Sequence, residues 1–239
     1  MTSFLIGGMP LLDTSYNETP TSTEALTKSA LHETWDALLK KHVTNMGKVN
    51  YAAIRENTKP LNDYLNLLAE NEPASNWDQN RKLAYWINLY NASTVKLIVD
   101  NYPISSITKL DKPWDKPFIR VGDQVLTLNQ VEHEIIRKRF DEPRIHFAVN
   151  CAAKSCPPLL NQAYKGETLG NQLDRVTRNF IRSANNDIQK DAVRLSKIFE
   201  WYGSDFGDLV KFLNRYVNPP IAEGTSISFM EYDWSLNKQ

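Results

Sequence analysis

Residues 83–99 read LAYWINLYNASTVKLIV, and this stretch decides the fold. Apolar side chains fall on nearly every face of a helix of this length, which predicts a central helix that is buried on all sides. Asn88 and Asn91 lie three residues apart and therefore share one side of that helix. A buried amide without partners costs about 1–3 kcal/mol. Either these amides tie the helix to a neighbouring loop, or one of them orients a catalytic or ligand group.

Shorter segments with helical or alternating patterns lie on both sides of the central helix. Helices are predicted over residues 27–43, 60–69, 168–184 and 204–216, a further helix begins at a capping box of Thr127 and Gln130, a hairpin covers 118–126, and strands cover 144–150, 193–195 and 227–232. No repeat and no change of composition divides the chain. The sequence therefore predicts an α+β fold, a helix-dominated single domain over residues 27–239 with a small, mainly antiparallel sheet.

The charge balance argues against polyanionic partners. The 239 residues include 28 Lys and Arg against 28 Asp and Glu, whereas nucleic-acid binders carry a basic surplus that releases counterions. No apolar stretch approaches the roughly 18–20 residues of a membrane span. We therefore expect neither a nucleic-acid partner nor a membrane span.

Residues 1–26 are predicted to form a flexible lead-in, an N-terminal segment before the folded domain. Residues 4–12 read FLIGGMPLL and resemble the apolar part of an export signal, but no Lys or Arg precedes them. Residues 13–23 are rich in Thr, Ser, Asn and Pro without periodicity. The segment is interpreted either as a remnant of an export signal or as an N-terminal arm that packs on the domain.

The densest group of reactive side chains lies in residues 144–158, RIHFAVNCAAKSCPP. On the predicted strand, His146 and Cys151 point to opposite faces, so they are not expected to pair. A thiol needs a base or a positive neighbour to become a nucleophilic thiolate. His133, from the helix after the capping box, is the candidate base. Cys156 is a second candidate nucleophile.

Other uses of these side chains stay open. Both cysteines can be buried as small hydrophobic residues, or they can form a Cys-x4-Cys disulfide. Glu132 and His133 are adjacent and point about 100° apart on an α-helix, so they are poorly placed to share a metal ion. A metal site of His133, His146 and a cysteine would require tertiary proximity, and no metal is expected. No glycine-rich dinucleotide motif, P-loop or Gly-x-Ser-x-Gly elbow occurs, so no cofactor is expected either.

Several motifs resemble those of a known family, DUF547 (domain of unknown function 547), which occurs widely in bacteria and also in plants. The motifs are VNY at 49–51, WINLYNA at 86–92, LNQVEH at 128–133, RIHFAVNC at 144–151 with SCP at 155–157, LSKIFEWY at 195–202 and YDWSLN at 232–237. They contain Asn88, Glu132, His133, His146 and Cys151. The resemblance implies an exported, periplasmic location, because bacterial members carry export signals; a cytoplasmic location is not excluded.

The leading hypothesis is a thiol-dependent hydrolase or acyl-transfer enzyme. Its mechanism would resemble that of papain or transglutaminase, and its substrate would be a peptide or another small acyl compound. A cysteine is the nucleophile, His133 the base, and Glu132 or the Asn88 amide orients that base. The order Asn, His, Cys differs from papain, so a kinship would be permuted or convergent. The alternative is a non-catalytic extracytoplasmic binding or assembly module with a structural Cys151–Cys156 loop. The sequence does not indicate the oligomeric state.

Overall fold

The computed structural model describes residues 30–189 and 192–239. The predicted lead-in over residues 1–26 lies outside the described residues, as does the predicted start of the first helix at residue 27. Within the described ranges, no helix combines the length and hydrophobicity of a membrane span.

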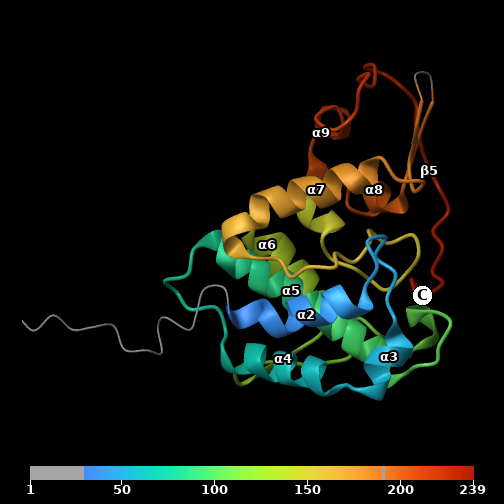
Figure 1. The fold of residues 1–239 in the computed structure, drawn as a ribbon. Coiled ribbons are helices and arrows are strands. Elements are labelled where there is room, and N and C mark those ends of the chain that lie inside the picture. The colour runs from blue at the N-terminus through green and yellow to red at the C-terminus, as the bar shows by residue number, and fades with distance from the viewer. Residues whose placement is uncertain (1–29, 190–191) are drawn as a thin grey trace, which may run out of the picture.

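The central element is helix α5, Gln79–Asp100, whose side chains from Leu83 to Val95 are all buried. The carboxylate of Asp78 caps its first turn by accepting from the Arg81 N–H at 2.8 Å. Figure 1 shows α5 crossing the middle of the molecule between two groups of shorter helices. The prediction of a buried central helix from the apolar stretch is therefore confirmed.

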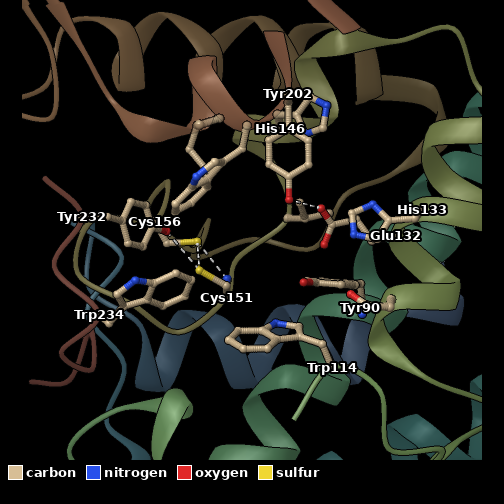
Figure 2. A pocket seen from close by; sticks show the side chains of 14 residues that line it. Tyr90, Trp114, Glu132, His133, His146, Cys151, Cys156, Tyr202, Tyr232 and Trp234 are labelled. Atoms are coloured by element: carbon tan, nitrogen blue, oxygen red, sulfur yellow. Dashed lines mark hydrogen bonds between the residues drawn. The ribbon is translucent and has the colours of Figure 1, made fainter. Parts of the chain in front are cut away.

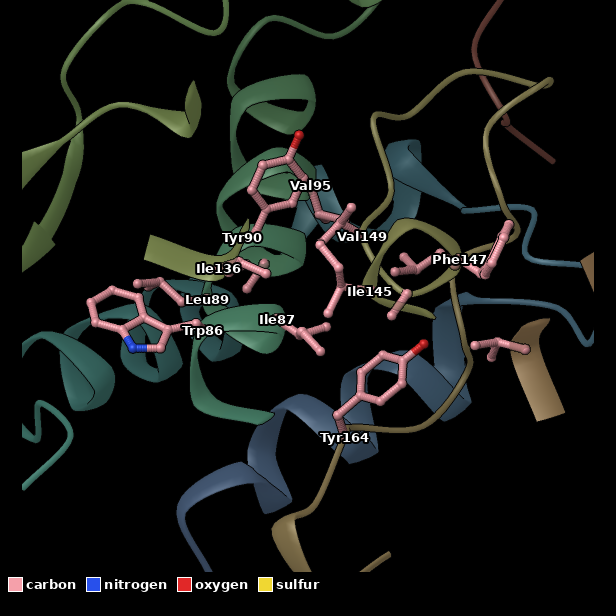
Figure 3. Close-up of a cluster of buried hydrophobic side chains, with 14 of the residues drawn as sticks. Trp86, Ile87, Leu89, Tyr90, Val95, Ile136, Ile145, Phe147, Val149 and Tyr164 are labelled. Carbon is pink, nitrogen blue, oxygen red and sulfur yellow. The ribbon is translucent and has the colours of Figure 1, made fainter. Parts of the chain in front are cut away.

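The shorter helices cover α5 on two sides (Figure 1). On one side lie η1 (Ala30–His32), α2 (Glu33–His42), α3 (Tyr51–Glu56) and α4 (Lys59–Glu70); on the other lie η5 (Gly166–Thr168), α7 (Leu169–Ile181), α8 (Lys197–Trp201), η6 (Gly203–Phe206) and α9 (Leu209–Leu213). A 3₁₀ turn, η2 (Ile107–Lys109), lies in the loop after α5. Figure 3 shows the core against α5, where Ile87 and Tyr90 meet Ile145 and Val149.

Two small sheets complete the α+β fold. β1 (Ile119–Val121) and β2 (Gln124–Leu126) form the predicted antiparallel hairpin, with Gly122 at φ +54° in its turn. In the second sheet, β4 (Val193–Leu195) pairs antiparallel with β3 (Asp187–Ile188) and parallel with β5 (Ile227–Phe229). The predicted fold class is confirmed, although the last pairing is parallel.

The capping box opens a π-helix. The Thr127 and Gln130 side chains each accept from the other residue's N–H at 3.0 Å. They are followed by η3 (Gln130–Ile136), a π-helix, and by the short α6 (Arg137–Arg139). π-Helices have i→i+5 hydrogen bonds and often occur at functional sites. Glu132 and His133 both lie on this π-helix and line the same cavity, described below.

Two secondary-structure predictions were wrong. Residues 144–150 do not form a strand; Pro143–Phe147 form the 3₁₀ helix η4, in which Ile145, His146 and Phe147 are all buried. A segment buried on every side gives no reliable period, and Pro143 favours a helical first turn. The predicted helix over 204–216 is split into η6 and α9, because Gly207 adopts φ +61° between them.

Candidate functional site

The described residues enclose a cavity of about 230 Å³ at the junction of the central helix, η3, η4 and the C-terminal segment (Figure 2). Its walls are mainly aromatic, with one carboxylate, two histidines and two thiols. The lining residues are Tyr90, Trp114, Asn129, Glu132, His133, His146, Val149, Cys151, Cys156, Ile198, Trp201, Tyr202, Tyr232 and Trp234. Five of the six predicted site residues therefore meet at one cavity, and Asn88 does not.

Asn88 has a structural place instead. Its amide donates to the Tyr164 carbonyl at 2.8 Å and accepts from the Tyr164 N–H at 3.0 Å. Asn91 joins α5 to a second loop in the same way, through the Ala148 carbonyl and the Asn150 N–H, each at 2.9 Å. Both amides tie the central helix to loops, which is the first of the two interpretations offered for them.

The cysteine loop is held in an unusual backbone conformation. Ala152 follows Cys151 with φ +63°, a left-handed conformation that costs energy for a residue other than glycine. The Asn150 side chain supports this turn by accepting from the Ala152 N–H at 2.9 Å. The C-terminal segment then clamps the loop, because Lys154 N–H donates to the Ser235 carbonyl at 2.8 Å. The same pairing carries the aromatic residues of 232–234 to the cavity.

The two cysteines are free thiols in direct contact. Cys151 is half-buried and Cys156 is buried. Their Sγ atoms lie 2.7 Å apart, and the Cys151 N–H donates to Cys156 Sγ at 2.9 Å. The Tyr232 hydroxyl lies 3.1 Å from Cys151 Sγ. Cys151 is thus the more accessible sulfur, surrounded by hydrogen-bonding groups.

These contacts separate the acidities of the two thiols. The hydrogen bond from Cys156 lowers the pKa of Cys151, and bonds from Tyr232 and the Ala153 N–H act in the same direction against burial. Burial raises the pKa of Cys156 well above its ordinary value, and the charge of Cys151 adds to this. In a coupled pair, one proton leaves first. Of the two thiols, Cys151 therefore loses its proton more readily, with Cys156 as its hydrogen-bond donor.

A buried carboxylate lies across the cavity from the sulfurs (Figure 2). Glu132 is 5% exposed and accepts from the Tyr202 hydroxyl at 2.7 Å. Burial, followed by the charge of Glu132, raises the pKa of both Tyr202 and Tyr90. Both phenols therefore stay protonated and act as hydrogen-bond donors beside this carboxylate.

His133 presents a donor rather than a free base. Its Nδ1 lies 3.1 Å from a guanidinium nitrogen of Arg137. Arginine can only donate, so Nδ1 accepts and the proton of the neutral ring sits on Nε2. The lone pair of Nδ1 is therefore already used in the hydrogen bond from Arg137. To act as the predicted base, His133 must first release Arg137.

His146 belongs to the support of the site. Its Nε2 lies 2.8 Å from Asp205 Oδ2, its ring stacks on Tyr202 with centroids 4.0 Å apart, and burial lowers its pKa. Arg137 holds the same Asp205 carboxylate through two bonds of 2.7 and 2.8 Å. His146, Asp205 and Arg137 form a clamp that fixes Tyr202 and His133. The hydrogen bonds of both pocket histidines go to this clamp and not to a cysteine.

Sequence reasoning missed most of the aromatic wall and the clamp. Tyr202, Tyr232 and Trp234 lie in motifs that carried the family resemblance, so their positions were marked without a role. Trp114 comes from the loop after α5, and nothing in the sequence pattern singled out Asp205. Among residues 30–189 and 192–239, no group of three His, Cys, Asp or Glu side chains is arranged to hold a metal ion.

Comparison with known families identifies part of the chain. Residues 74–181 match the family described as "Protein of unknown function, DUF547". Neither the curated proteins nor the solved structures gave a match. The matched region includes α5, η3, η4 and the cysteine loop, whereas the aromatic residues of 201–234 lie beyond it. The match over residues 74–181 supports the resemblance of this part of the chain to the DUF547 family.

Proposed function

We propose that the chain is a cysteine-dependent hydrolase or acyl-transfer enzyme in which Cys151 is the nucleophile. The observation that carries this proposal is the asymmetry of the thiol pair. Cys151 borders a cavity and has a lowered pKa, whereas Cys156 is buried and keeps its proton. A lowered pKa and partial exposure are the properties of reactive cysteines.

The reaction would proceed through a thioester. The Cys151 thiolate attacks the carbonyl carbon, the C–S bond forms, and the electron pair of the carbonyl moves to its oxygen. When the carbonyl reforms, the bond to the leaving group breaks, and the leaving group departs and takes up a proton from water. Water or another acceptor then attacks the thioester, giving up a proton and restoring the thiolate. Glu132 is the carboxylate across the cavity and would take this proton, while Tyr202 and His133 offer donors to developing negative charge.

Thiol–disulfide exchange is the second candidate, favoured by the 2.7 Å separation of the two sulfur atoms. The Cys151 thiolate would attack a substrate disulfide, form a mixed disulfide and release one thiolate. After losing its proton, Cys156 would displace the second thiolate and close a Cys151–Cys156 disulfide. Two electrons would pass from the pair to the substrate.

Alkylation of the native protein tests the common basis of both candidates. Iodoacetamide rates are measured from pH 5 to 9 and the adducts are mapped by mass spectrometry. We expect Cys151 to react faster than free cysteine at pH 7 and Cys156 to stay unmodified. In Cys156→Ala the pKa of Cys151 should rise, because its main donor is gone. Thiols that react no faster than free cysteine would contradict both candidates and favour the non-catalytic module.

Two probes separate the candidates. An activated ester such as p-nitrophenyl acetate should leave an acetyl adduct on Cys151 if acyl transfer is the function. Hydroxyethyl disulfide should instead give the Cys151–Cys156 disulfide if exchange is the function. Cys151→Ala is the control in both assays, since it should give neither product.

A further inference from the structure

We infer that the cavity recognises a small organic cation, so that the acyl substrate carries an ammonium group. This inference rests on the proposed function for the acyl part of the substrate, whereas the recognition of the cation stands on the walls of the cavity alone. No step of bond formation is involved in that recognition.

The first observation is an aromatic cage. Tyr232 packs against Trp201 and Trp234 with centroid separations of 4.8 and 4.6 Å. Trp114 meets Trp234 edge to face at 5.7 Å. Figure 2 shows Tyr232 and Trp234 beside the sulfurs, with Trp114 along the lower edge of the cavity between Cys151 and Tyr90. Ring faces carry partial negative charge, and cages of this kind bind quaternary ammonium groups.

The second observation is the sign of the charge. Glu132 places a carboxylate in the wall. None of the described residues that line the cavity is a lysine or an arginine. The nearby Arg137 is paired with Asp205 through two short hydrogen bonds. A cation is therefore favoured in this cavity and an anion is disfavoured.

The third observation concerns size and access. The volume of about 230 Å³ is below the roughly 300–1,000 Å³ of pockets for drug-sized ligands, so the occupant is small. Trp201 is 46% exposed, which is unusual for a large aromatic side chain. Because Trp201 also lines the cavity, its exposure places this part of the wall at the solvent boundary. A compact ammonium head group meets these requirements of size, charge and surface.

The test compares a cation with its neutral isostere. Choline and 3,3-dimethyl-1-butanol have the same shape, but carbon replaces the charged nitrogen in the second. Binding is measured by isothermal titration calorimetry with the full chain. We expect choline to bind at least tenfold more tightly, which is about 1.4 kcal/mol. Equal affinities, tighter binding of the alcohol, or no measurable binding of choline would overturn the inference.

Variants locate the binding. Glu132→Gln removes the charge at nearly constant shape, and Glu134→Gln makes the same change at an exposed position of the same helix. We expect at least a fivefold loss of choline affinity in Glu132→Gln and none in Glu134→Gln. Trp234→Leu, checked for its fold by circular dichroism, should also weaken choline binding. Equal affinity in Glu132→Gln and Glu134→Gln would place the cation elsewhere and overturn the inference.

Cys151→Ala separates this inference from the proposed function. The variant lacks the nucleophile but keeps the aromatic wall and Glu132, so it should bind choline within threefold of the wild type. If choline binds while Cys151 proves unreactive, the cation site holds and the enzymatic proposal fails. If Cys151 reacts and choline does not bind, the reverse is true.

Discussion

Acidification should destabilise the fold through one buried histidine, His32. It is 5% exposed, and its Nδ1 lies 2.7 Å from the Tyr64 hydroxyl. Burial, with smaller contributions from the charges of Lys165 and Arg81, lowers its pKa from 6.5 to about 4. The unfolded chain therefore binds the proton first as the pH falls. A separation of about 2.5 pH units between the two pKa values corresponds to about 3 kcal/mol of lost stability.

The pH window follows from the sign of the shift. The stability contributed by neutral His32 is complete above about pH 7.5, falls by about 2 kcal/mol by pH 5, and falls by about 3 kcal/mol by pH 4. His32→Gln keeps a hydrogen-bonding partner for Tyr64 but does not titrate. The variant should be less stable by about 1 kcal/mol at pH 7.5. Below about pH 6 it should become the more stable protein.

Urea unfolding followed by circular dichroism at pH 7.5, 6, 5 and 4 measures this difference. His146 and His42 also have lowered pKa values because of burial, but they titrate in both proteins. Subtracting the two stability curves therefore isolates His32. Curves that stay parallel from pH 7.5 to 4 would refute the reasoning, since they would mean that the proton is bound equally by the folded and unfolded chains.

Three further substitutions test the site and its supports. Tyr202→Phe removes the donor to Glu132 but keeps the ring; turnover of an acyl substrate should fall at least tenfold, with only about 1–3 kcal/mol of stability lost in urea unfolding. Asn91→Ala leaves two buried backbone groups without partners and should cost about 2–6 kcal/mol by the same measurement. Gly47→Ala should lower thermal stability by about 2–3 kcal/mol, because φ is +72° and a Cβ would lie 2.5 Å from Pro158. Gly170→Ala, with open space around it in α7, is the control and should be neutral or stabilising.

The sequence predicted those helices in which the pattern of apolar residues shows burial on one face or on all faces. The central helix follows from its apolar stretch, and the capping box of Thr127 and Gln130 is present with both hydrogen bonds. The sequence did not predict that this box opens a π-helix, because hydrogen bonding from i to i+5 leaves no mark in residue types. The segment around His146 was predicted as a strand, since β-branched and aromatic residues buried on all sides fit either state.

Local motifs indicated residues that line one cavity, but not how these residues are arranged. Glu132, His133, His146, Cys151 and Cys156 were chosen from dense motifs, and all five line the cavity. The partners that set their chemistry come from distant parts of the chain. Asp205 lies 59 residues from His146, and Tyr232 lies 81 residues from Cys151. Contacts at such separations depend on tertiary packing, and local sequence patterns carry no information about it.

The 3₁₀ turn around His146 changes which residues can activate Cys151 and which can accept a proton in the proposed mechanism. A straight strand would have placed His146 and Cys151 on opposite faces, so His133 was assigned as base by elimination. In the turn, His146 is directed to Asp205, and through Arg137 that carboxylate also holds His133. Nδ1 of His133 and Nε2 of His146 are thereby occupied in one clamp, whereas Nδ1 of His146 has no hydrogen-bond partner among the described residues. In the proposed mechanism, activation of Cys151 then depends on its hydrogen-bond donors, Cys156 above all, and Glu132 takes up the proton of the attacking water or acceptor. The substitution Cys156→Ala should consequently slow the alkylation of Cys151 more than a substitution of His133 or His146 does.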